Sequence, residues 1–137
     1  MMANVVSVGT SVPAPQVSGS LDREVTTAPI TLALFGLVIP QGDNRVILNA
    51  TVGVRSTLLA PVLIFNIFRG NQIIFSSREE VLLSAGQEQT VSLHAIDTNV
   101  PATINEAYLL TVQLEDALSA AEVVGPVNFS GVSYSYP

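Results

Sequence analysis

Apolar and polar side chains alternate with a period of two along three long segments of the chain. In residues 45–55 one parity is apolar, and the other carries Asn49, Thr51 and Arg55. The same alternation runs through residues 88–97 and 107–115. Successive side chains of a β-strand point to opposite faces, whereas those of a helix repeat every 3.6 residues. Since Val, Ile and Thr, which favour strands, also make up over a quarter of the chain, the pattern predicts an all-β protein.

Turn-forming residues divide the chain into strands at short intervals. Residues 40–44 separate a strand over residues 30–39 from the strand that follows. Residues 69–72 predict a tight hairpin, because Gly70 and Asn71 tolerate the positive φ of primed turns. Residues 84–87 end the next strand. The strands in this middle part of the chain are expected over residues 62–68, 72–77 and 80–83.

The last third of the chain contains two longer connections between strands, here called crossings, and a final strand. Residues 97–105 form the first crossing, and residues 116–126 form the second, where one helical turn capped by Asp116 is expected. In the final strand, residues 127–136, the apolar parity changes, and a bulge near Ser130-Gly131 restores a common face. The total of about eight or nine strands predicts a two-sheet antiparallel jelly-roll sandwich.

The N-terminal part differs from the rest in lacking a strong core pattern. We assign residues 1–29 to an extended arm or leader and residues 30–137 to the jelly-roll domain. Two interpretations of the arm remain open: a leader that lies on the surface, or a strand that pairs with an edge of a neighbouring subunit. The second interpretation gives assembly roles to Val5, Val6, Val8 and Val12.

The few charges of the chain exclude several classes of partner. Only 12% of residues are charged, the net charge is −6, lysine is absent, and no two of the five arginines are closer than nine residues. Nucleic acids and anionic membranes both attract clustered cations, so neither is expected as a partner. The apolar stretches are too short to span a bilayer, and no signal peptide precedes Arg23.

No residue pattern points to catalysis, a metal or a cofactor. The absence of Cys and Lys removes thiolate and Schiff-base chemistry. His94, the single histidine, lies on the polar parity of its strand, with no nucleophile or carboxylate at a recognisable spacing. Glu79 and Glu80 are adjacent on a strand and therefore point to opposite faces. We expect a protein that is not an enzyme and that needs no metal or cofactor.

Apolar residues exceed what one small sandwich must bury. Residues 30–39 and 58–68 are apolar on both parities, and 48% of the chain is hydrophobic. A strand that is apolar on both faces of a two-layer fold needs something to cover its outer face, and obligate subunit interfaces have this composition. We therefore expect self-association. The aromatic residues assigned to an assembly or core face are Phe65, Phe68, Phe129, Tyr134 and Tyr136.

Residues 62–77 resemble the central hairpin of the C1q/TNF-like jelly-roll family, in which a strand enters a polar Asn/Gly turn and returns along a second strand. Phe129-Ser-Gly131 lies where that family often carries Phe-Ser-Gly, whereas residues 46–50 lack its usual Gly-x-Tyr. The resemblance implies a homotrimer and, by analogy with leaderless jelly rolls of Bacillus-type spores, an extracellular or spore-surface location. The segments that resemble the family's last three strands are residues 91–95, 108–114 and 128–137.

Two functions from different classes follow from these observations. The first is a non-enzymatic structural protein that self-assembles, as a homotrimer or as a fibre or layer bridged by the arm, alongside other surface-layer proteins. Contacts between unlike faces propagate when they fail to close, so one fold has access to both forms. The alternative is a trimeric receptor- or glycan-binding head of viral or phage type, with recognition loops at residues 42–44 and 97–105.

Overall fold

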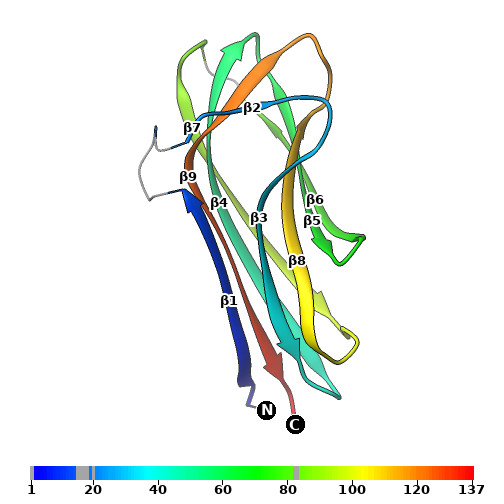
Figure 1. Ribbon diagram of the computed structural model, residues 1–137. Coiled ribbons are helices and arrows are strands. Elements are labelled where there is room, and N and C mark those ends of the chain that lie inside the picture. Colours follow the sequence, from blue (N-terminus) through cyan, green and yellow to red (C-terminus); the bar gives the residue numbers. More distant parts are fainter. Residues whose placement is uncertain (1, 15–18, 20, 82–83) are drawn as a thin grey trace.

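Two antiparallel sheets face each other in the computed structural model of the protein (Figure 1). The structure describes residues 2–14, 19, 21–81 and 84–137. These described residues form strands and turns but no helix, and hence no helix that would cross a membrane. The prediction of a two-sheet antiparallel sandwich with eight or nine strands is confirmed.

The five-stranded sheet has the order β1-β9-β4-β7, with β2 also paired to β9, and the four-stranded sheet has the order β3-β8-β5-β6. The strands of the five-stranded sheet are β1 Asn4–Ala14, β2 Arg23–Val25, β4 Asn44–Leu58, β7 Glu88–Thr98 and β9 Ala120–Ser135. Those of the four-stranded sheet are β3 Ile30–Ile39, β5 Val62–Arg69, β6 Gln72–Glu80 and β8 Thr103–Leu114. The predicted hairpin joins β5 to β6, and Gly70 there has a φ of 61°.

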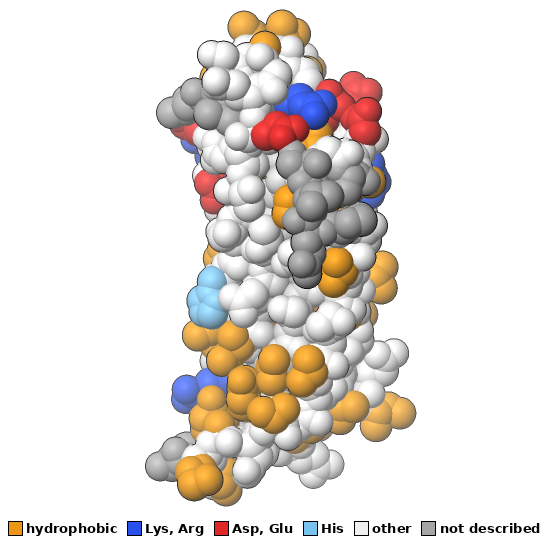
Figure 2. All heavy atoms as spheres, turned by 90° about the vertical axis from the view of Figure 1, so that its left-hand side faces the viewer, with side chains coloured by type: hydrophobic (Ala, Val, Ile, Leu, Met, Phe, Trp, Pro, Cys, Tyr) orange, Lys and Arg blue, Asp and Glu red, His pale blue; other side chains and the backbone are white. Residues whose placement is uncertain are grey.

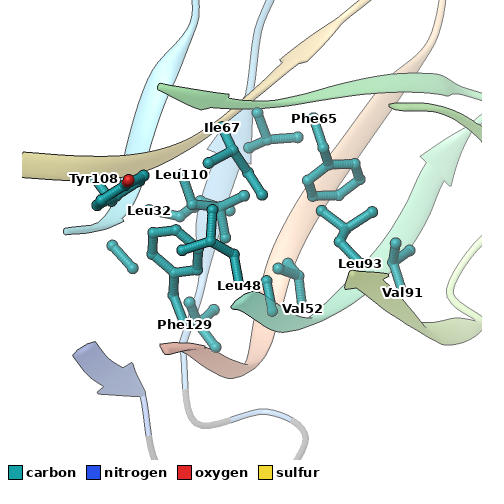
Figure 3. Packing of buried hydrophobic residues seen from close by; sticks show 14 of the residues in the cluster. Leu32, Leu48, Val52, Phe65, Ile67, Val91, Leu93, Tyr108, Leu110 and Phe129 are labelled. Carbon is teal, nitrogen blue, oxygen red and sulfur yellow. The ribbon is translucent and has the colours of Figure 1, made fainter. Parts of the chain in front are cut away.

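The core lies between the sheets and is built from the inward parity of each strand. Phe129 of β9 packs against Phe35 of β3 with ring centroids 4.6 Å apart, and Phe35 stacks on Tyr108 of β8 at 5.9 Å. Figure 3 shows Phe65 of β5 lying across from side chains of the other sheet. Replacing such a buried ring by alanine typically costs about 3–5 kcal/mol. The inward residues of β4 are those of its alternation: Val46, Leu48, Ala50, Val52 and Val54.

The N-terminal strand β1 is part of the sandwich of its own chain. It pairs antiparallel with β9 and closes the side of the sandwich next to β3. The hydroxyl of Ser7 accepts a hydrogen bond from the Val38 amide at 3.2 Å, and that of Ser11 accepts one from the Leu34 amide at 3.3 Å. These serines therefore satisfy edge amides of β3, which has no strand partner on that side.

The contacts of β1 explain why this part of the sequence lacks a strong core pattern. Gly9 faces inward against the Phe35 ring and the Gly36 carbonyl, where a Cβ would collide with both. The inward positions of β1 are thus filled by serine and glycine rather than by large apolar residues, so the sequence shows no apolar alternation there. For the arm to bridge two subunits, β1 would have to leave β9 of its own chain and pair with β9 of a neighbouring subunit.

The irregularity of the final strand lies elsewhere than expected. In β9 the alternation of buried and half-buried residues continues without a break through Ser130-Gly131, so the bulge predicted there is wrong. The register of β4 against β9 shifts instead between Val52 and Val54, where Gly53 lies too close to the Gly125 carbonyl for any side chain. The apparent change of parity arises because the inward residue Ser133 is polar; its hydroxyl donates to the Val38 carbonyl at 2.7 Å.

Two smaller expectations also need correction. Residues 116–119 form a turn rather than a helical turn, and the Asp116 carboxylate accepts from the Leu118 amide at 2.9 Å. β9 begins directly afterwards at Ala120, which leaves no room for a helix. The strand expected over residues 80–83 is not separate, because β6 runs on to Glu80 and Val81 lies outside it; residues 82–83 fall outside the described residues.

Candidate interaction surfaces

Four apolar side chains lie side by side on the outer face of the five-stranded sheet. Cross-strand pairing places Val8 of β1 opposite Val132 of β9, Val132 opposite Ile47 of β4, and Ile47 opposite Ile96 of β7. Val8 is 63% exposed and Ile96 56%, while Val132 and Ile47 are half-buried. Strands lie about 4.8 Å apart, so this first apolar row is about 14 Å long.

Polar and bulky residues flank the first apolar row on opposite sides. On one side, Oδ1 of Asn49 accepts a 2.8 Å hydrogen bond from Nδ1 of His94, which is exposed as the alternation predicts. On the other side, Arg45 lies opposite Tyr134, and its guanidinium stands 4.7 Å from the centre of the Tyr136 ring. The row therefore has a polar flank on one side and an aromatic, cationic flank on the other.

Charged side chains gather at the far end of the same face. Figure 2 shows apolar side chains on the half of the face below the histidine and charged groups at the upper end. Arg55 donates to Glu88 at 2.8 Å and lies 4.0 Å from Glu122. A hydrogen bond with Asp22 and desolvation raise the pKa of the Glu122 carboxyl. No three described His, Asp or Glu side chains are placed to hold a metal ion.

A second apolar row crosses the outer face of the four-stranded sheet. Leu34 of β3 pairs with Leu109 of β8, Leu109 with Phe68 of β5, and Phe68 with Ile73 of β6. Leu34 is 58% exposed and Ile73 51%. This second apolar row also spans four strands, which gives it about the same length as the first.

The flanks of the second apolar row are polar on one side and small on the other. Thr31, Thr111 and Asn66 form the polar flank, and the buried Thr111 hydroxyl has no hydrogen-bond partner. Gly36 pairs with Ala107 on the other side, and Gly70 donates its amide to the Ala107 carbonyl at 2.8 Å. A hollow of about 330 Å³ lies over Phe68, Leu109 and the polar flank, bounded by the small residue Gly70.

A buried polar cluster joins the two sheets next to both rows. Arg69 of β5 donates two hydrogen bonds to the Asp97 carboxylate of β7, at 2.8 and 2.9 Å, and Tyr108 of β8 donates to the same carboxylate at 3.0 Å. Burial, together with the negative charge of Asp97, raises the pKa of the Tyr108 hydroxyl. The Asp97 carboxylate thus accepts hydrogen bonds from an arginine and a tyrosine.

The remaining candidates for chemistry have structural partners. His94 contacts an amide, Asn49, which cannot act as the orienting carboxylate of a catalytic dyad. Arg78 binds Glu115 through two contacts, at 2.7 and 2.9 Å, and binds Glu80 at 3.1 Å. These bonds lower the pKa of Glu115 and raise that of Arg78. Each carboxylate of this exposed group is therefore neutralised in part by the same guanidinium.

The predicted assembly residues divide between the surface and the core. Val5, Val6, Val8 and Val12 all lie exposed on β1, and Tyr134 and Tyr136 are half-buried. Phe65 and Phe129 are fully buried between the sheets, so they belong to the core alone. Phe68 faces outward in the second apolar row. The row members that sequence reasoning missed are Ile47, Ile96, Val132, Leu34, Leu109 and Ile73.

A sequence signal for the first apolar row does exist. Ile47 lies on the same parity as the polar residues Asn49 and Thr51, and Ile96 on the same parity as His94. An isoleucine on the polar parity of an otherwise alternating strand marks an exposed apolar position. The pairing register, which aligns the two isoleucines, becomes visible only in the fold.

No protein-family model and no curated protein matches the chain. Among solved structures, it is similar to a chain of the infectious bursal disease virus Gt strain, at 11% identity and a TM-score of 0.58, over 93% of this chain. It is also similar to Eiger TNF from S. frugiperda, at 5% identity, a TM-score of 0.55, and 94% and 92% coverage of the two chains. A third similar structure is an arabinose-bound α-L-arabinofuranosidase, at 10% identity and a TM-score of 0.51, over 94% of this chain and 23% of that one.

These similarities establish the fold. The chain spans 37% of the length of the viral chain but nearly the whole of Eiger TNF, so the likeness covers one jelly roll. The jelly-roll architecture expected from the sequence is thereby confirmed. Because similar folds occur in a virus, a TNF and a glycosidase, function must come from the surfaces of this chain.

Proposed function

We propose that this protein is a non-enzymatic structural subunit that associates with copies of itself through the outer faces of its sheets. The observation that carries the proposal is the first apolar row, in which four strands present apolar side chains in register. Edge and outer-face positions of antiparallel sheets are normally polar when they face water. An aligned apolar row is therefore expected to be covered.

The free energy gained by burying the first apolar row limits how the assembly can form. Burying a Val or Ile side chain completely contributes about 1.5–3 kcal/mol, so four partly exposed ones supply on the order of 3–6 kcal/mol. Association itself costs about 4–15 kcal/mol. One row alone is therefore marginal, and stable assembly requires the flanking groups or a second contact face.

The family and the cellular location that we propose both extend the resemblance found in the sequence. Residues 62–77 and 128–137 support membership of the C1q/TNF-like family, and similarity to Eiger TNF and a viral chain fits an oligomeric module. We propose a location on a bacterial spore or cell surface, with other surface-layer proteins as further partners. Immunogold labelling of intact spores and cells tests this location, and signal confined to the cell interior contradicts it.

Substitution in the first apolar row tests the self-association. Ile96→Asp places a charge in the row on an edge strand, where the exposed position leaves the fold intact, and we expect the assembly to dissociate. Ser92→Asp is the matched control, because Ser92 lies on the same strand and face but outside the row. Sedimentation velocity measures the mass, and circular dichroism verifies folding. Wild-type protein that stays monomeric at tens of micromolar (about the range of weak interfaces) contradicts the proposal.

A binding head is the second candidate, supported by the hollow over Phe68 and Leu109. Its wall is apolar, and Thr31 and Asn71 offer polar groups at its rim, a combination suited to the apolar face and hydroxyls of a sugar ring. The loop at residues 42–44 and the crossing after β7 remain further recognition candidates. A glycan array with wild-type protein, and with Phe68→Ser as control, distinguishes this role: specific binding lost in the variant supports it, and silence contradicts it.

A further inference from the structure

We infer that copies of this chain stack head to tail, with the first apolar row of one copy lying on the second apolar row of the next, so that assembly propagates as an open fibre. The inference rests on the proposed self-association and names its partner surface. It follows from the presence of two different apolar rows on opposite faces of the same sandwich. A dimer formed through one face leaves the other row exposed, whereas head-to-tail contacts cover both.

The two rows have matching dimensions and strand order. Each crosses four strands, and β1 lies next to β3 at one side of the sandwich while β7 approaches β6 at the other. At β1 the rows are offset along the strands, because the Ser7 and Ser11 hydroxyls accept from the Val38 and Leu34 amides, so Val8 lies about three residues, or about 10 Å, from the level of Leu34. A copy moved along the normal to the sheets, and shifted along the strands by this offset, therefore brings its first row over the second row of its neighbour.

The flanking residues are complementary under the same movement. The first row has a polar flank with Asn49 and His94, which meets the polar flank of the second row, containing Thr31 and Asn66. The bulky flank of the first row, Tyr134 with Arg45, meets the small flank of the second. That small flank consists of Gly36, Ala107 and Gly70. The large side chains of one copy thus face the small residues of the next, and polar side chains face polar side chains.

Charge also favours unlike faces. Arg69 lies 2.8 Å from Asp97 and 3.9 Å from Glu106, so one guanidinium is shared by two carboxylates near the small flank. Glu106 reaches to the vicinity of Gly70, and this excess negative charge lies where Arg45 of the next copy would arrive. If two first rows met face to face about an axis parallel to the strands, Arg45 would instead oppose its own copy.

The geometry of stacked sheets sets the expected repeat. Face-to-face sheets pack about 10 Å apart, so a two-layer subunit advances the fibre by about 20 Å. Aligned sheets of a sandwich differ in direction by about 30°, and each subunit adds two such steps, one inside it and one at the contact, so each copy is rotated by about 60°. A translation combined with a rotation about the same axis does not close, and the expected product is a helical fibre.

Two variants and their mixture test this pairing. Ile96→Asp destroys the first row and Ile73→Asp the second, both at positions more than half exposed on edge strands. Each variant alone should be monomeric in sedimentation velocity, since each lacks one half of every contact. Mixed in equal amounts, they should form heterodimers of twice the monomer mass and no larger species, because one intact pair of rows remains. Ser92→Asp, on β7 but outside the first row, should form wild-type fibres.

The outcomes separate this inference from the proposed function. Dimers of Ile73→Asp alone would show that first rows pair with each other, and a wild-type mass that stops at three copies would show a closed trimer. Either result overturns head-to-tail stacking while leaving self-association standing. A wild-type monomer overturns both. Negative-stain micrographs of the wild type should show fibres with a repeat of about 20 Å per subunit.

Discussion

At the residue scale, the least predictable feature of this protein is the contact of Arg69, Asp97 and Tyr108 between the sheets. Arg69 ends its strand next to a turn, and Asp97 opens the crossing expected over residues 97–105, so the sequence suggests solvent exposure for both. The fold instead buries the carboxylate and surrounds it with three donated hydrogen bonds. Only the pairing of sheets, which no local pattern encodes, brings these strands together.

The buried pair predicts a specific pattern of stabilities. Arg69→Met should lower the free energy of unfolding by about 3–5 kcal/mol, because it leaves the Asp97 carboxylate buried without its counter-charge. Arg69→Met combined with Asp97→Asn should recover most of that loss, since a neutral amide still accepts from Tyr108. Urea unfolding measures both. Arg78→Met, which removes an exposed ion pair, serves as control and should cost far less than Arg69→Met; equal losses for Arg69 and Arg78 variants would contradict the argument.

At the scale of elements, the strands with one apolar and one polar parity were predictable, and those held by small residues were not. The alternations over residues 45–55 and 88–97 lie within observed strands, and that over residues 107–115 does so except for Glu115, because one face of each contacts the core. For β1 the sequence left a surface leader and a strand as alternatives, since its inward positions are Ser7, Gly9 and Ser11, which touch β3 without large apolar side chains. In β9, likewise, the inward residue Ser133 is polar and interrupts the apolar parity, although the strand itself is continuous.

The close approach of β1 to β3 predicts a sharp difference between neighbouring residues. Gly9→Val should destabilise the protein by about 1–3 kcal/mol, because its Cβ would collide with the Phe35 ring and the Gly36 carbonyl. Thr10→Val, on the exposed parity of the same strand, should have little effect. Urea unfolding gives the energies, and hydrogen exchange at the β9 amides reports whether β1 has detached. A silent Gly9→Val would show that β1 does not pack against the core in solution.

At the scale of the whole molecule, the two outer faces determine how many copies can meet. The sequence already indicates excess apolar surface, because residues 30–39 are apolar on both parities, and the fold places Leu34 and Val38 on the outside as that pattern implies. The alignment of apolar residues from four strands into a row depends on register, which is set by long-range pairing and by bulges. For this reason the sequence predicts association but not its direction.

Salt dependence distinguishes apolar assembly from assembly by ion pairs. Each copy carries a net charge of −6, so like copies repel, and the first row brings only Arg45 into the proposed contact. Raising ionic strength from about 10 mM to about 150 mM shortens the Debye length from about 30 Å to about 8 Å and screens that repulsion. We therefore expect fibres to form at lower protein concentration in the higher salt, as light scattering would measure. Ser92→Asp should shift that concentration only slightly, whereas dissolution of wild-type fibres by salt would show that ion pairs, not the apolar rows, hold the copies together.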